Sequence, residues 1–258
     1  MRAHCLALID AAAPACVAVK PQLARFEALG APGRAALQAV VEHARAAGLL
    51  VIADGKRGDI DVTAQAYAAS LLGGLQTPYG HVAGLEADMV TVNPLMGRDA
   101  IAPFLAAARA HGAGVLLLVR TSNPGAADVE ELVLEGGETV WERLARLVAE
   151  LGEPDPGGGP ADVGAVIGAT APGHLERARE LMPAAPFLLP GIGAQGGRVE
   201  DLLAAFAPGP AGGLVSASRS IASAHLVRGG DPARAARQEA QELRERAWQL
   251  AAGAPAGG

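Results

Sequence analysis

The sequence predicts an α/β fold, because short apolar runs alternate with longer amphipathic stretches along its 258 residues. The apolar runs lack a polar face, as expected for parallel strands buried on both sides. Alternating strands and helices are typical of a parallel sheet with crossover helices. Polar residues also gather at nearly every predicted strand end. This favours a (β/α)8 TIM barrel, whose active site is built from those ends, over an open sheet with one crevice.

Seven strands are predicted, each as a short apolar run. They cover Cys16–Lys20, Leu49–Asp54, Met89–Asn93, Val115–Thr121, Val163–Ala169, Phe187–Pro190 and Leu214–Ser218. The helices expected between and around them cover Ala3–Ala12, Ala31–Ala47, Thr63–Leu72, Arg98–Ala110, Val140–Leu151, His174–Leu181 and Arg198–Phe206. We assign residues 1–230 to one catalytic barrel domain, 231–250 to a C-terminal surface helix of the same domain, and 251–258 to a flexible tail.

A closed barrel of this kind needs eight strands, and the sequence supplies seven. Because the chain opens with a helical segment followed by a strand, the one that we miss is the first, expected upstream of Met1. An open sheet would expose two unpaired edges, which is a liability for a soluble protein. We therefore expect either that the natural protein starts earlier, through a misplaced start or a truncated gene record, or that the chain is a damaged barrel.

Composition excludes several classes of function. The net charge is −6, so no broad basic surface for nucleic acid or anionic lipid is expected. No apolar run is long enough for a membrane span, and the first residues lack a secretory signal, which predicts a cytoplasmic protein. The two cysteines, Cys5 and Cys16, are too few for a disulfide framework, and no cysteine or histidine spacing predicts a metal site.

The densest group of reactive side chains is Asp54-Gly-Lys-Arg-Gly-Asp59. Asp54 and Lys56 are two residues apart, so on an extended strand end they point the same way. A lysine beside carboxylates stays protonated, and its ammonium can neutralise a developing carbanion and then donate a proton. Lys20, the only other lysine, ends the preceding strand and could reach the same cavity. The alternatives are a surface salt-bridge cluster and a rim lysine whose stem covers apolar surface.

Two further segments suit a nucleotide. The glycine-rich loop 190–197 follows one strand and Arg219 follows the last, an arrangement that predicts a phosphate site, although a glycine-rich turn is the alternative. In the segment Arg120-Thr-Ser-Asn-Pro-Gly, Ser122 and Asn123 could hydrogen-bond the edge of a heterocycle. They could equally cap an ordinary turn.

Taken in order, these motifs resemble orotidine 5′-phosphate decarboxylases of the bacterial subgroup with a D-A-K-R-G-D-I signature. The likeness runs from about Leu6 to Ile221. It rests on Val19-Lys-Pro-Gln-Leu, Asp54-Gly-Lys-Arg-Gly-Asp-Ile, Val92-Asn-Pro, Arg120-Thr-Ser-Asn-Pro-Gly, Val166-Ile-Gly-Ala-Thr, Pro190-Gly-Ile-Gly-Ala-Gln-Gly-Gly and Ser218-Arg-Ser-Ile. Gly55 replaces the usual alanine, and Asp61 replaces a common glycine.

The resemblance implies a (β/α)8 barrel, usually a homodimer, that decarboxylates orotidine 5′-monophosphate to UMP without a cofactor or metal, as the last step of de novo pyrimidine nucleotide synthesis. By this likeness Lys56 protonates C6, and Asp54 and Lys20 complete the charged network beside it. Asp59 and Thr63 are expected to reach the neighbouring subunit's site.

The resemblance also assigns residues to the rest of the substrate. Ser122 would hold the pyrimidine and Pro190 would line the base pocket. Gln195 and Arg219 would grip the phosphate.

Two rival functions remain open. One is a Mg²⁺-dependent phosphosugar decarboxylase or aldolase of the same barrel group, such as a keto-gulonate phosphate decarboxylase or a hexulose phosphate synthase; these share D-x-K-x-x-D but lack the Arg120–Gly125 motif. The other is an N-terminally truncated, inactive remnant that binds nucleotide or phosphate, which the absent first strand favours.

Overall fold

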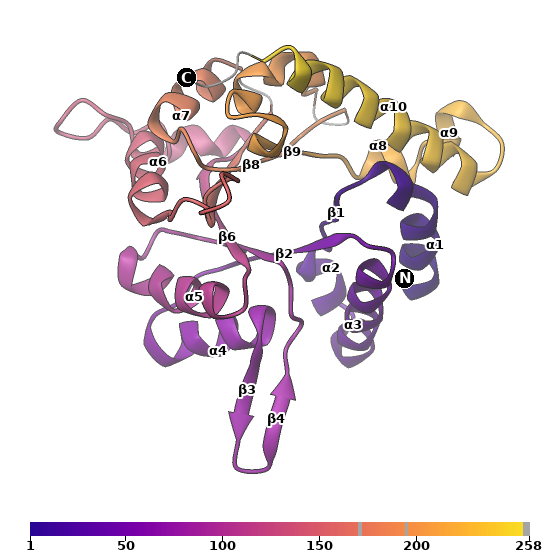
Figure 1. Cartoon of the computed structure of the whole chain (residues 1–258), viewed down its shortest axis with the longest axis horizontal. Helices are drawn as coiled ribbons and strands as arrows, with labels where there is room; N and C mark the ends of the chain where they lie inside the picture. Colours follow the sequence, from indigo (N-terminus) through magenta and orange to yellow (C-terminus); the bar gives the residue numbers. More distant parts are fainter. Residues whose placement is uncertain (170–171, 194–195, 255–258) are drawn as a thin grey trace. The chain divides into compact units, whose positions relative to one another are not determined.

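The structure, a computed structural model, describes residues 1–169, 172–193 and 196–254. The chain divides into two compact units. Unit 1 contains Met1–Val115 and Ala222–Gln241, and unit 2 contains Leu116–Ile221 and Glu242–Gly258. In both units strands and helices alternate along the chain, as the sequence predicts (Figure 1).

Unit 1 carries parallel strands in the order β1 (Ala18–Val19), β2 (Leu50–Arg57) and β5 (Met89–Val92). β2 runs past its predicted end, as far as Arg57. Its register against β5 shifts between Ala53 and Arg57. Such an irregularity bends a strand and re-aims the side chains that follow it, so this shift determines where the end of β2 points.

Most helices of unit 1 bury residues in the core. The helices of this unit are α1 (Arg2–Ala12), the 3-10 helix η1 (Ala13–Ala15), α2 (Leu23–Glu27), α3 (Gly30–Ala46), α4 (Asp61–Leu72), α5 (Arg98–Ala110) and α9 (His225–Arg228). Of these, η1 and α9 do not bury residues in the core. α3 buries Leu37, Val40, Val41 and Ala44, which recur at helical spacing. In the part of the chain that the structure describes, no helix combines the length and the apolar composition that crossing a membrane requires.

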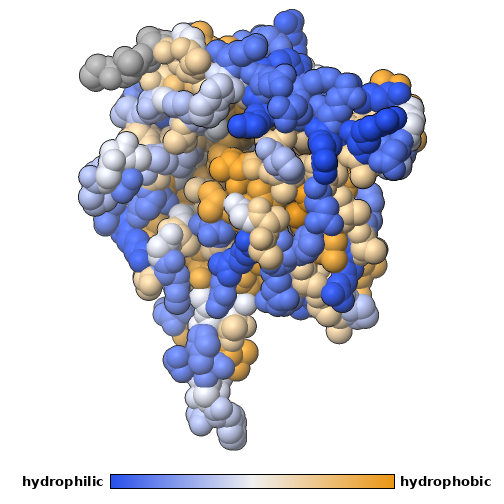
Figure 2. All heavy atoms as spheres, turned by 45° about the vertical axis from the view of Figure 1, so that its right-hand side comes forward, coloured by the Kyte–Doolittle hydropathy of each residue, from blue (hydrophilic) through white to orange (hydrophobic). Residues whose placement is uncertain are grey.

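A β-hairpin between α4 and β5 was not expected from the sequence. It consists of the antiparallel strands β3 (Gly74–Thr77) and β4 (Gly80–Ala83). Leu75 and Val82 pair across the hairpin and are both more than half exposed, and Tyr79 at its tip is fully exposed. Figure 1 shows the hairpin extending away from α4 and α5, and Figure 2 shows hydrophobic residues on its surface. Each strand is short and begins at a glycine, so the sequence contains no alternation of apolar and polar residues long enough to predict it.

Unit 2 carries parallel strands in the order β6, β7 (Val163–Ile167), β8 (Phe187–Pro190) and β9 (Gly213–Ser216). β6 covers Gly114–Arg120 and belongs to unit 2 from Leu116 onward. Every residue of β7 is buried, as expected for a strand covered on both faces.

Three helices of unit 2 match predicted ones: α6 (Val140–Leu151), α7 (Pro172–Leu181) and η3 (Val199–Phe206). η2 (Pro124–Asp128), η4 (Pro210–Gly212) and α8 (Arg219–Ala222, in unit 2 as far as Ile221) were not predicted. α6 starts with a capping box, in which the Thr139 hydroxyl accepts from the amide of Glu142 and the Glu142 carboxylate accepts from the amide of Thr139. This reciprocal pair fixes the start of α6 at its predicted residue.

The predicted helix Arg198–Phe206 forms as the 3-10 helix η3. Pro208 has no N–H group, so the carbonyl of Ala204 has no α-helical donor four residues on. The Ala204 oxygen accepts instead from the amide of Ala207 at 3.3 Å and from Nε of Arg179 at 3.3 Å, and Nη2 of Arg179 donates to the Ala205 oxygen at 2.8 Å. These bonds satisfy carbonyls at the C-terminal end of η3.

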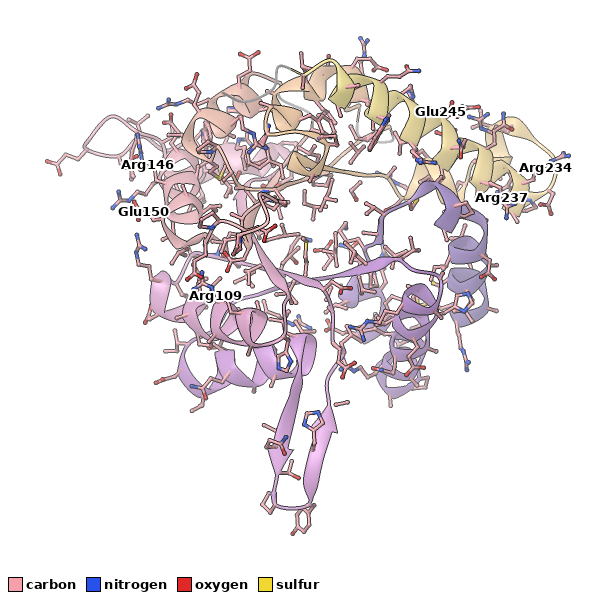
Figure 3. The ribbon with its side chains drawn as sticks, in the orientation of Figure 1. Arg109, Arg146, Glu150, Arg234, Arg237 and Glu245 are labelled. Atoms are coloured by element: carbon pink, nitrogen blue, oxygen red, sulfur yellow. The ribbon has the colours of Figure 1, made fainter. Side chains whose placement is uncertain are left out.

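The C-terminal helix α10 spans Pro232–Ala252. Arg237, labelled in Figure 3, donates to the backbone oxygens of Ala11 at 3.2 Å and Asp10 at 3.4 Å, within unit 1. Because those oxygens belong to the last turn of α1, the cation lies at the negative end of that helix.

The predicted limits 1–230, 231–250 and 251–258 stay predictions. α10 covers Pro232–Ala252, and residues 255–258 lie outside the described residues. The assignment of residues 1–250 to a single domain stays a prediction.

Candidate active site

The ends of β1 and β2 bring Lys20, Asp54 and Lys56 together in unit 1. Lys20 donates from Nζ to Oδ2 of Asp54 at 2.7 Å, and Lys56 donates from Nζ to Oδ1 at 2.5 Å. The Asp54 side chain is 4% exposed and that of Lys56 is 43% exposed. Asp54 is therefore a fixed anion between two ammonium groups, and Lys56 remains accessible to a ligand.

Thr91 in β5 completes this cluster, and the sequence analysis missed it. Its hydroxyl accepts from the backbone amide of Lys56 at 2.9 Å and lies 3.0 Å from Oδ1 of Asp54, to which it donates. The backbone of Lys56 has φ 47°, in the left-handed region that residues with a side chain rarely adopt. Thr91 thus fixes both the backbone of Lys56 and the carboxylate that its side chain contacts. The available signal was one hydroxyl in an otherwise apolar, buried strand.

The charges around Asp54 favour its ionised form. Burial alone raises the pKa of the Asp54 carboxyl, but the charges and hydrogen bonds of Lys20 and Lys56 outweigh that effect and hold the pKa below its usual 3.8. The cluster therefore carries a carboxylate at neutral pH.

Asp59 lies in the short segment between β2 and α4, and Thr63 lies in α4. The Asp59 carboxylate accepts from the amide of Ile60 at 2.9 Å, and Thr63 is exposed on the first turn of α4. Gly58 passes close to β5, because a Cβ there would lie 3.1 Å from the carbonyl oxygen of Asn93. Among the hydrogen bonds of the described residues, none joins Asp59 or Thr63 to the Asp54 cluster of the same chain.

Ser122 follows β6 in unit 2 and is half-buried. Gly168, just after β7, lies directly against it: a Cβ at Gly168 would come within 2.9 Å of the Cα of Ser122. Gly168 also donates its amide proton to the carbonyl of Arg120 at 2.7 Å. The backbone around Ser122 is therefore held against the end of the next strand.

Pro190 is the last residue of β8, and the glycine-rich loop starts directly after it. The loop closes through backbone bonds between Gly193 N and Gly197 O at 3.0 Å and between Gly197 N and Gly191 O at 3.1 Å. Gly193 has φ 74°, which favours glycine at this position.

Arg219 is exposed at the first residue of α8, beside this loop. A Cβ at Gly193 would lie 3.4 Å from the Cβ of Ser220, so the loop and the start of α8 are in contact within unit 2. Gln195, the other predicted phosphate ligand, lies outside the described residues.

The described residues contain no group of three or more His, Cys, Asp or Glu side chains that could hold a metal ion. Independence from metal ions stays a prediction, to be tested in solution.

Comparison with known proteins gives a consistent picture. Residues 1–244 match the model of the orotidine 5′-phosphate decarboxylase / HUMPS family. The chain is 46% identical to an orotidine 5′-phosphate decarboxylase of Deinococcus radiodurans, over 95% of this chain and 84% of that one. It is 44% identical to the enzyme of the same name from Rhodopirellula baltica, over 86% and 72%. A solved structure from Streptomyces avermitilis, described as a putative orotidine 5′-phosphate decarboxylase, matches with a TM-score of 0.80 and 34% identity, over 96% and 81%.

Parallel strands that alternate with helices and carry a lysine–aspartate cluster at their ends have the arrangement of a barrel enzyme in which an ammonium group can stabilise a carbanion. The chain belongs to the orotidine 5′-phosphate decarboxylase / HUMPS family. Its fold is that of a (β/α)8 barrel, and the described residues supply seven of the parallel strands without the first. Its activity is the decarboxylation of orotidine 5′-monophosphate to UMP in pyrimidine synthesis. Neither rival, the Mg²⁺-dependent phosphosugar enzyme or the inactive remnant, finds support among these relatives.

Proposed function

We propose that Lys56 is the proton donor in this decarboxylation. Departure of CO₂ breaks the bond between C6 and the carboxylate carbon and leaves the electron pair on C6. The Lys56 ammonium neutralises that pair and transfers a proton from Nζ to C6, which yields UMP and a neutral lysine that regains a proton from water. The observation that carries this proposal is the placement of Lys56 Nζ, accessible yet bonded to the buried Asp54 carboxylate at 2.5 Å.

Asp54 holds that ammonium in place by accepting its hydrogen bond through Oδ1, and Lys20 fixes the other carboxylate oxygen, Oδ2. A preorganised cation needs little rearrangement as the carbanion forms, so its effect is greater in the transition state than in the ground state.

The other substrate groups are assigned to unit 2. Ser122 contacts the pyrimidine, Pro190 lines the base pocket, and Gln195 and Arg219 bind the phosphate. A guanidinium presents paired N–H donors that suit phosphate oxygens. Contacts to a phosphate remote from C6 supply binding energy that positions the reacting base.

The active form proposed is a homodimer in which Asp59 and Thr63 reach the neighbouring subunit's site. Supporting this, apolar side chains adjacent to them in sequence are largely exposed in the single chain: Ile60, which follows Asp59, at 51% and Val62, which precedes Thr63, at 73%. Burial of such a group against a second copy would remove apolar surface from water.

The proposed location is the cytoplasm. Cys5 and Cys16 are free thiols, which suits a reducing compartment. No cofactor, nucleic acid or membrane is proposed as a partner.

Replacement of Lys56 tests the proposed function. In Lys56→Ala we expect turnover of orotidine 5′-monophosphate to fall by about 10³-fold or more, because a positioned acid contributes about 10²–10⁴-fold. UMP should still bind, since the phosphate contacts are intact. Lys56→Arg keeps the positive charge but is too weak an acid to donate its proton, so it should be as inactive as the alanine variant. The assay follows loss of substrate absorbance.

The same assay with EDTA tests independence from metal ions. Wild-type turnover should be unchanged by EDTA, and loss of activity that Mg²⁺ restores would contradict the proposal. Activity retained in Lys56→Arg would assign Lys56 a purely electrostatic role.

A further inference from the structure

The turn that carries Ser122 is held by an acidic residue that the mechanism above does not use. Glu130 lies between η2 and α6, and its side chain is 17% exposed. One of its carboxylate oxygens, Oε1, accepts from the hydroxyl of Thr121 at 2.7 Å. The other, Oε2, accepts from the backbone amide of Thr121 at 2.9 Å. The carboxylate thus binds the residue immediately before Ser122 at two points.

The Thr121 hydroxyl has a single proton and two acceptors within reach, Oε1 of Glu130 and Oδ1 of Asn123, each at 2.7 Å. A hydrogen bond to an ionised carboxylate is the stronger of the two. Glu130 is therefore the dominant partner of Thr121, and its removal would free the turn to adopt another conformation.

The backbone of Glu130 is anchored independently of its side chain. Its amide donates to the carbonyl of Ala126 at 2.7 Å, and its carbonyl accepts from the amide of Trp141 at 2.9 Å. Ala126 and Trp141 are both buried. The carboxylate is consequently presented from a fixed point, as a positioning group needs to be.

Arg120 links this carboxylate to a second one. Its Nη1 lies 3.5 Å from Oε2 of Glu130, and its Nη2 donates to Glu131 at 2.5 Å. Glu131 is bonded to Arg120 but makes no contact with Thr121 among the interactions of the described residues. The two neighbouring glutamates therefore share a cation, and only Glu130 bonds Thr121.

We propose that Glu130 is a positioning residue that sets the orientation of Ser122 and, through it, the affinity of the site for the pyrimidine base. The inference rests on the proposed contact between Ser122 and the base. Glu130 affects the binding of the base half of the substrate, the pyrimidine, and leaves the binding of the other half, the ribose phosphate, unchanged.

Two ligands separate these halves. UMP carries base, ribose and phosphate, whereas ribose 5-phosphate lacks the base. In Glu130→Ala we expect the affinity for UMP to fall by about tenfold, comparable to the loss of a hydrogen bond to a charged group, and that for ribose 5-phosphate to stay within about twofold of wild type. Isothermal titration calorimetry of the full chain measures both.

Three variants distinguish positioning from general stability. Glu130→Gln keeps an acceptor for the Thr121 amide and should bind UMP nearly as tightly as wild type. Glu131→Gln keeps an oxygen acceptor for Nη2 of Arg120, whose Nη1 also donates to the Thr121 carbonyl, and leaves both bonds from Thr121 to Glu130 in place, so both affinities should stay within about twofold of wild type. Thr121→Val removes the hydroxyl alone and should weaken UMP selectively; it carries the test if Glu130→Ala does not fold.

Selective loss of UMP binding in Glu130→Ala or Thr121→Val supports the proposal. Equal losses for both ligands, or no loss of UMP affinity, would overturn it. A wild-type protein that binds UMP no more tightly than ribose 5-phosphate would instead contradict the proposed role of Ser122 in base recognition.

Discussion

Asp54 is the residue on which the charged cluster depends, because it is buried and its two oxygens serve both lysines and Thr91. Burial alone would raise the pKa of Asp54 in the folded chain. The charges and hydrogen bonds of Lys20 and Lys56 outweigh that effect and hold the pKa below its usual value of 3.8. A carboxyl whose folded pKa is depressed stabilises the fold fully above its unfolded pKa. That contribution is lost as the pH falls through the folded pKa.

This linkage predicts a pH-dependent difference between wild type and Asp54→Asn. The asparagine variant has no proton to bind at this position. We expect the wild-type free energy of unfolding to decline relative to that of the variant as the pH drops below 3.8, the pKa of this carboxyl in the unfolded chain. Above about pH 5 the difference should be constant. Urea unfolding at a series of pH values measures it, and parallel pH profiles for the two proteins would rule the linkage out.

At the residue scale the sequence predicted the charged cluster at the ends of β1 and β2 and missed residues that position predicted site residues through hydrogen bonds. Lys20, Asp54 and Lys56 stand out because lysine is rare in this chain and strand ends are easily located. Thr91 and Glu130 do not stand out. Each acts through a contact to a residue distant in sequence or to a backbone amide, and neither kind of contact leaves a local pattern.

At the scale of elements, hydrophobic periodicity located most strands and helices to within a few residues, since buried strands and amphipathic helices differ in period. Periodicity did not predict the end of β2 or the helix type of η3, where contacts with other parts of the chain act. β2 extends past its predicted end with a register shift against β5, and the last carbonyls of η3 accept from Arg179 in α7, contacts that leave no local pattern in the sequence.

Arg179 joins several elements of unit 2. It lies in α7, and Nη1 donates to the carbonyl of Ala185 at 2.8 Å before β8, while Nη2 reaches that of Gly212 at 3.2 Å before β9. Its guanidinium lies 3.8 Å from the ring centroid of Phe187 in β8. Burial lowers its pKa to about 10, so it remains a cation at neutral pH. One side chain therefore ties α7 to the starts of the two strands whose ends carry the proposed phosphate site.

Arg179→Met tests this connection. The variant leaves several buried carbonyls without donors, so we expect it to lose about 3 kcal/mol of unfolding free energy. Arg179→Lys retains a cation with three donors but loses the planar stacking on Phe187. Its free energy of unfolding should lie between those of wild type and Arg179→Met. Arg177→Met, on the exposed face of the same helix, is the matched control and should change stability far less. Equal urea midpoints for Arg179→Met and Arg177→Met would contradict the role given to Arg179.

At the scale of the whole molecule, the fold class and the family were predictable, because ordered motifs at strand ends are specific even when each alone is weak. The β3–β4 hairpin was not, and neither is the way two copies associate, since a single chain records an interface only as exposed apolar groups. Ile60 and Val62 are such groups, and they adjoin Asp59 and Thr63 in the sequence.

If Asp59 serves the neighbouring subunit's site, two inactive variants should restore activity when mixed. In a heterodimer of Lys56→Ala and Asp59→Ala, one site combines the native lysine of one subunit with the native aspartate of the other. Random exchange in a twofold-symmetric dimer then makes about a quarter of all sites native, so we expect about a quarter of wild-type activity. Mixing Lys56→Ala with Lys56→Arg supplies no native lysine and should stay inactive. Co-refolding followed by the decarboxylation assay measures this, with native mass spectrometry to establish that heterodimers form. Heterodimers without recovered activity would place Asp59 in the site of its own subunit, because only a shared site makes the two lesions complementary.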